Sequence, residues 1–65
     1  MSDVDTLKAE IKSLSAKATQ AKMDLHDLAE ELPIDWQRIP EVAQRCYELH
    51  GRLAEARGRL RALTG

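Results

Sequence analysis

The sequence contains one cysteine, two prolines, three glycines, one tryptophan, one tyrosine and no phenylalanine. A single cysteine, Cys46, cannot form a disulfide within the chain. An interior with so few aromatic side chains must be built from leucine, isoleucine, valine and alanine, which is typical of packed helices. No apolar run is long enough to span a membrane, and the polar, acidic first residues are unlike a secretory signal. We therefore expect a protein of the reducing cytoplasm.

The sequence also has no large excess of acidic or of basic residues. The net charge is −1, so the surplus of basic residues typical of nucleic-acid-binding proteins is missing. Residues 3–31 hold seven acidic residues and four lysines, whereas residues 35–63 hold four acidic residues and six arginines, so the two halves attract each other. A chain of 65 residues is one small domain, residues 1–65, whose core barely offsets the entropy lost on folding. Self-association or a metal ion is expected to add stability.

Apolar residues recur at alternating spacings of three and four, the pattern of helices that pack by knobs-into-holes contacts. The first stripe contains Val4, Leu7, Ile11, Leu14, Ala18, Ala21, Leu25, Leu28 and Leu32. The second contains Ile39, Val42, Cys46, Leu49, Leu53, Ala56, Leu60 and Leu63. The predicted fold is all-α, an antiparallel hairpin with a helix over about 3–31, a turn at 32–35 and a helix over about 36–63. Its first helix ends before Pro33, because the residue preceding a proline resists helical geometry.

Local signals shape the second helix. Asp35 is expected to cap its start, and Pro40 falls in the first turn, where a distortion rather than a break is expected. Gly51 and Gly58 each cost about 1 kcal/mol relative to alanine, so the last three turns are the ones most prone to fray or bend.

Folding back at the turn brings together core positions whose numbers sum to 67. All eight resulting pairs are apolar: Val4–Leu63, Leu7–Leu60, Ile11–Ala56, Leu14–Leu53, Ala18–Leu49, Ala21–Cys46, Leu25–Val42 and Leu28–Ile39. In the same register four arginines on one flank face three acids and one lysine, as Arg38–Glu31, Arg45–Asp24, Arg52–Lys17 and Arg59–Glu10. The sequence also predicts ion pairs within the second helix, from Glu41, Glu48 and Glu55 to the arginines four residues later.

The opposite flank is small or aromatic. It contains Ala29, Trp36, Ala43, Tyr47 and Ala54, with Ser15 and His50 among them. Two helices cover only one side of each apolar stripe, so a second hairpin is expected to cover the rest. We therefore predict a homodimeric four-helix bundle or a larger helical assembly.

A distinctive motif surrounds the predicted turn. It comprises Lys22-Met23-Asp24-Leu25-His26-Asp27-Leu28-Ala29-Glu30, then Leu32-Pro33, Asp35-Trp36, Ile39 and Val42-Ala43. Through it nearly the whole chain resembles the Rop-type helical hairpins, and most closely a family of short Rop-like proteins encoded in bacterial nitrogen-fixation gene clusters. The resemblance implies a setting in nitrogen fixation and metal binding, but no known reaction. We expect the protein to bind another protein of nitrogen fixation.

Candidate metal ligands lie within this motif. His26 and Glu30 are four residues apart on one helix face, with Asp27 beside them. Two strong ligands are too few, so Glu41 of the other helix or the same residues of a second chain are expected to complete a site for Fe, Ni or Zn. His50, four residues after Cys46, is a further candidate, whereas Cys46 itself is expected to fill space in the core. The alternative is a solvated acidic face that binds nothing.

Catalysis is not expected, since the sequence has no phosphate-binding glycine loop and no nucleophile beside a base. The main alternative function is RNA binding by a Rop-like bundle, through four basic residues near the open end of the hairpin, Lys8, Lys12, Arg57 and Arg61. No aromatic residue lies near them in the sequence pattern, which disfavours this alternative. The predicted function is that of a non-enzymatic accessory protein.

Overall fold

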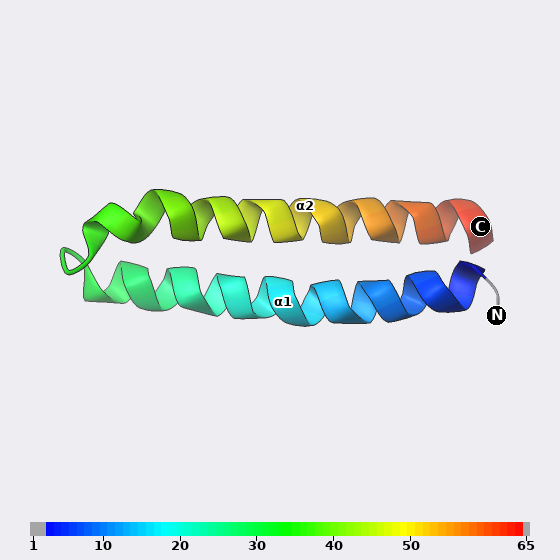
Figure 1. Cartoon of the computed structure of the whole chain (residues 1–65), viewed down its shortest axis with the longest axis horizontal. Helices are drawn as coiled ribbons and strands as arrows, with labels where there is room; N and C mark the ends of the chain where they lie inside the picture. The colour runs from blue at the N-terminus through cyan, green and yellow to red at the C-terminus, as the bar shows by residue number, and fades with distance from the viewer. Residues whose placement is uncertain (1–2, 65) are drawn as a thin grey trace.

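The computed structural model describes residues 3–64, which form two long helices folded back on each other (Figure 1). Helix α1 (Asp3–Glu31) and helix α2 (Ile39–Thr64) run antiparallel, and a short 3₁₀ helix, η1 (Trp36–Arg38), precedes α2. The hairpin measures 47 × 15 × 14 Å, with the turn at one end and the outer ends of both helices at the other. The predicted all-α hairpin is confirmed. Neither helix, over residues 3–64, is long and apolar enough to cross a membrane.

The turn between α1 and η1 holds its own backbone hydrogen bonds. The Ile34 amide donates to the Glu31 carbonyl at 3.0 Å, and the Arg38 amide donates to the Asp35 carbonyl at 2.9 Å. The peptide bond between Leu32 and Pro33 is cis. Asp35 has a φ of 56°, in the left-handed region that aspartate tolerates better than most residues. It precedes η1, but its side chain makes no capping hydrogen bond, so the expected side-chain cap is absent.

The distortion expected near Pro40 takes the form of η1. Because residues 36–38 form a 3₁₀ turn, α2 begins at Ile39 and places Pro40 in its first turn, where the missing amide costs little. Beyond this point α2 continues through Gly51 and Gly58 to Thr64 without interruption, although both glycines weaken it.

The core runs along the hairpin between the two helices, on the predicted apolar stripes. Six side chains of the described residues are buried, namely Leu7, Ala18, Ala21, Leu28, Leu53 and Ala56. Cys46 is half-buried, in agreement with a space-filling role. The outermost layers are more open than predicted, because Ile39 and Leu63 are 37% and 56% exposed. A layer at the end of a bundle has a neighbouring layer on one side only, so its side chains keep contact with water.

The charged flank follows the predicted register but pairs differently. Arg59 and Glu10 line the same hollow between the helices, as predicted. Arg59 also binds Glu55 of its own helix at 2.8 Å, the pair that the spacing of four residues predicted. Arg38 likewise binds Glu41 at 3.3 Å rather than Glu31. Residues three and four apart are neighbours on a helix surface, so each arginine reaches a carboxylate one turn away on its own helix.

Candidate functional site

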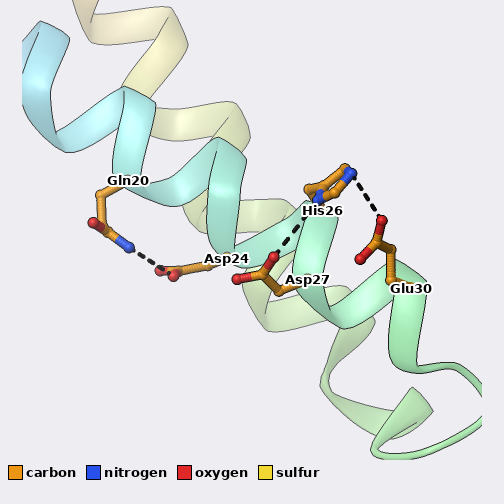
Figure 2. A network of polar contacts seen from close by, with 5 residues as sticks. All are labelled: Gln20, Asp24, His26, Asp27 and Glu30. Carbon is orange, nitrogen blue, oxygen red and sulfur yellow. Dashed lines mark hydrogen bonds and ion pairs between the residues drawn. The ribbon is translucent and has the colours of Figure 1, made fainter.

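The end of α1 carries a cluster of three polar side chains, His26, Asp27 and Glu30, hereafter the His26 cluster. The His26 imidazole lies beside both carboxylates, with Nδ1 3.5 Å from Asp27 Oδ1 and Nε2 3.4 Å from Glu30 Oε1 (Figure 2). All three residues come from α1, and Glu30 follows His26 by four residues and Asp27 by three, the spacings that make neighbours on a helix surface. One ligand atom of each residue lies within 4.8 Å of the other two.

The chemistry of the His26 cluster suits a divalent transition metal. One imidazole nitrogen and two carboxylate oxygens are ligands that such metals accept, and their spacing allows all three to approach one ion. Each side chain is about two-thirds exposed, so a bound ion would keep water or donors from another chain in its remaining positions. Alone, the same geometry is also that of two surface ion pairs, which stabilise a helix by a few tenths of a kcal/mol.

Two further predicted ligands lie apart from this cluster. Among residues 3–64, no group of three metal-ligating side chains contains Glu41 or His50. Glu41 accepts a hydrogen bond from Arg38 Nε at 3.3 Å, at the start of α2. His50 is exposed in the middle of α2, one turn beyond the half-buried Cys46. The sequence had set His50 apart as a separate candidate. It did not reveal that Glu41 lies apart from His26, because that position depends on how the chain turns between Glu31 and Ile39.

Asp24, one turn before the His26 cluster, has a hydrogen bond of its own. Gln20 Nε2 donates to Asp24 Oδ1 at 2.9 Å, one turn before the His26 cluster (Figure 2). Asp24 also lines a polar hollow of about 190 Å³ beneath the turn, together with Asp27, Leu28, Glu31, Asp35, Arg38 and Val42. This end of the hairpin therefore presents several carboxylates and one arginine.

Exposed apolar side chains surround the turn and form what we call the turn-end patch: Leu32, Ile34, Trp36 and Ile39. Trp36 is 59% exposed and Ile34 63% exposed. The sequence pattern had assigned Leu32 and Ile39 to the core stripes, and it included Trp36 in the flank that a second hairpin covers. The sequence pattern did not single out Ile34. Its position could have shown its exposure, because it directly follows a proline in a turn that is too short to bury an isoleucine side chain.

The basic residues near the open end lie around a second hollow, hereafter the open-end hollow. Its lining residues are Ile11, Ala54, Arg57, Leu60 and Arg61, and its volume is about 530 Å³. Arg57 and Arg61 therefore do converge, as the sequence predicted, while Lys8 and Lys12 are exposed on α1, three residues before and one residue after Ile11. Apolar side chains form much of its surface, so the hollow combines an apolar floor with a basic border.

Comparison with known proteins gives consistent matches over nearly the whole chain. The sequence profile of a family described as Rop-like matches residues 2–64. A "UPF0437 protein" of Azorhizobium caulinodans is 59% identical over 63 residues, which covers 97% of this chain and 91% of that protein. A "UPF0437 protein in nifX-nifW intergenic region" of Frankia alni is 41% identical over 56 residues, covering 86% of this chain and 68% of the relative. No solved structure gives a significant match.

Proposed function

Because the chain belongs to the Rop-like family, we propose that it is a small non-enzymatic accessory protein of nitrogen fixation. In this proposal it acts in the cytoplasm as a self-associated helical bundle and binds a partner protein through the acidic, histidine-bearing end near the turn. The setting is supported by the Frankia alni relative, whose name places it between nifX and nifW. The folded-back hairpin has the turn at one end and the outer ends of both helices at the other (Figure 1).

The observation that carries the partner-binding proposal is the charge around the turn. Residues 24–41 contain six carboxylates and only one basic side chain, Arg38, besides His26. The carboxylates of Asp27 and Glu30 are exposed, and within residues 3–64 each contacts His26 as its one ion-pair partner. A surface of this kind favours a partner with a basic face and accelerates their encounter at low salt.

Affinity capture from nitrogen-fixing cells tests this proposal. The double variant Asp27→Asn/Glu30→Gln removes two charges and keeps the shapes of the side chains. A matched control, Asp3→Asn/Glu10→Gln, removes the same charge at the opposite end of the hairpin. We expect a protein that is retained by the wild type and the control, released by salt, and absent from the capture with the first variant. Identical captured proteins for all three would reject the turn end as the contact.

We further propose that the His26 cluster binds a divalent transition metal, Fe, Ni or Zn. In support, three ligand atoms already lie within 4.8 Å of one another, so little side-chain movement is needed. Water, or Glu41 of a second chain, would complete the coordination. His50 is the competing site on α2.

Isothermal titration of Fe²⁺, Ni²⁺ or Zn²⁺ into protein without an affinity tag tests the metal proposal. We expect a binding heat that His26→Ala abolishes and that the matched variant His50→Ala retains. Equal heats for the wild type and His26→Ala would reject His26 as a ligand, and loss in His50→Ala alone would assign the ion to α2 instead.

RNA binding is the second candidate, favoured by the two arginines that line the open-end hollow. It predicts gel shifts that weaken steeply with salt and that Arg57→Ala and Arg61→Ala reduce, because each arginine removed leaves one phosphate charge without a counter-charge. No shift at low salt would remove this candidate.

A further inference from the structure

The turn-end patch lies at the end of the hairpin rather than along its sides. Leu32 and Ile34 belong to the loop that closes one end of the long axis (Figure 1). Ile34 is 63% exposed, and Trp36, at the start of η1, is 59% exposed. Large apolar side chains gathered in water at one place on a small protein mark a surface for a partner. A second hairpin packed along the flank covers the sides of the helices, which leaves this end available.

The backbone of the turn has little to offer to an extended strand. Four of its amides already donate hydrogen bonds to carbonyls of residues 29–35, namely those of Leu32, Ile34, Trp36 and Arg38. Pro33 has no amide hydrogen. No strand edge exists among residues 3–64 either, so a partner cannot add a strand to a sheet there. Side chains must therefore hold the partner, as they do when an amphipathic helix lays its apolar face on exposed apolar residues.

Charge around the patch determines the polar face of such a helix. Residues 24–41 hold six acidic residues and one arginine, a net charge of −5 with histidine neutral. That arginine, Arg38, is already paired with Glu41 at 3.3 Å. Four carboxylates line the polar hollow beneath the turn, those of Asp24, Asp27, Glu31 and Asp35. Lysine or arginine side chains of a partner would meet opposite charge here, whereas nucleic acids and anionic lipids would be repelled.

We propose that the turn-end patch binds a basic amphipathic helix of a partner protein. The apolar face of that helix contacts Ile34 and Trp36, and its lysine or arginine side chains face the surrounding carboxylates. The inference rests on the proposed partner binding at the turn end and adds the chemistry of the partner and the side chains that hold it. Burial of the indole and the isoleucine supplies affinity, because apolar area leaves water. The carboxylates accelerate the encounter and fix the orientation.

A synthetic peptide tests the chemistry of the partner. The probe is a helical peptide of about 14 residues without tryptophan, with leucines at spacings of three and four and lysines at the other positions. Trp36 is the sole tryptophan of the protein, so a blue shift of its emission reports burial of the patch. One control peptide has glutamate in place of lysine, and the other is a scrambled peptide of the same composition.

We expect the lysine peptide to shift the emission of Trp36 and to bind roughly tenfold more tightly than either control peptide. No shift at low salt, or equal binding of either control, would overturn the proposal. A shift that grows with protein concentration in the absence of peptide would assign the patch to a second copy, which also overturns it.

Two matched variants locate the contact. Ile34→Ser removes an exposed apolar side chain from the turn-end patch, and Tyr47→Ser removes one from the middle of α2, where Tyr47 is 76% exposed. We expect Ile34→Ser to raise the dissociation constant of the lysine peptide roughly tenfold and Tyr47→Ser to leave it unchanged. Equal dissociation constants for the two variants would overturn the patch as the docking surface. Circular dichroism at equal concentration checks that both variants remain helical.

Affinity capture from nitrogen-fixing cells separates this inference from the proposed function. We expect Ile34→Ser and Asp27→Asn/Glu30→Gln to lose the same captured protein. If Ile34→Ser retains a protein that Asp27→Asn/Glu30→Gln loses, contact at the turn end stands and the apolar anchor is overturned. If both variants retain every protein that the wild type captures, the turn end itself is rejected as the contact.

Discussion

The two glycines inside α2 provide a sharp test of how this hairpin is stabilised. Both lie in regular helix, and a Cβ atom built on Gly51 or Gly58 meets no atom within 4 Å. Replacing either with alanine therefore introduces no collision within one hairpin. The substitution also removes backbone freedom from the unfolded chain, which lowers the entropy lost on folding.

The size of the effect follows from helix propensity. Alanine is favoured over glycine by about 1 kcal/mol in a helix interior, and two sites seven residues apart are separated by about 10 Å, so their effects should nearly add. We expect Gly51→Ala/Gly58→Ala to raise the free energy of unfolding by about 1.5–2 kcal/mol. For a domain of this size each kcal/mol raises Tm by about 4–8 °C, so the double variant should melt about 6–16 °C higher.

Thermal melting followed by circular dichroism, at one fixed protein concentration, measures this shift. The matched control is Ala16→Gly, at an exposed position in the interior of α1, which should lower stability by about 1 kcal/mol. If alanine at residues 51 and 58 lowered Tm while the control behaved as expected, another molecule must occupy the space beside α2. That result would refute the reasoning that glycine at these two positions does nothing but weaken α2.

Other substitutions test separate parts of the hairpin. Leu53→Ala should lower the free energy of unfolding in urea by about 2–4 kcal/mol, because Leu53 is only 6% exposed. Leu63→Ala should lower it by under about 1 kcal/mol, because Leu63 is 56% exposed. Equal losses of stability would contradict the assigned core. Asp35→Gly should leave Tm nearly unchanged and Asp35→Val should cost about 1–2 kcal/mol, since φ is 56°. A double-mutant cycle on Glu55 and Arg59 should give a coupling of about 0.3–0.5 kcal/mol that high salt removes. No coupling at low salt would mean that the 2.8 Å contact contributes nothing.

The candidate site was predictable where it depends on neighbours along one helix. His26, Asp27 and Glu30 lie within one turn of α1, so helical geometry alone brings their side chains together. Glu41 and His50 belong to the other helix, and their position relative to His26 depends on how the chain turns between Glu31 and Ile39. The sequence could nominate these residues but could not place them.

For the arginines of α2, the sequence likewise predicted their position on the helix better than their partners. The heptad repeat correctly placed Arg38 and Arg59 on the flank that faces α1. The spacing of four residues predicted the pair of Glu55 and Arg59, but not that of Arg38 and Glu41. Several carboxylates lie within reach of a long side chain, and their energies differ by only tenths of a kcal/mol. Competition between such similar partners is decided by the local geometry of the folded surface.

What the sequence by itself determined is the all-α hairpin, its antiparallel register and the central core of Ala18, Ala21, Leu53 and Ala56. These follow from a periodic apolar pattern, since only one register buries every layer together. The tertiary structure decided the start of α2 at Ile39, the 3₁₀ turn before it, and the exposure of Ile34, Trp36 and the outermost layers. Periodicity holds only inside regular helices, whereas a turn and a bundle end depend on backbone torsions and on neighbours that no spacing rule encodes.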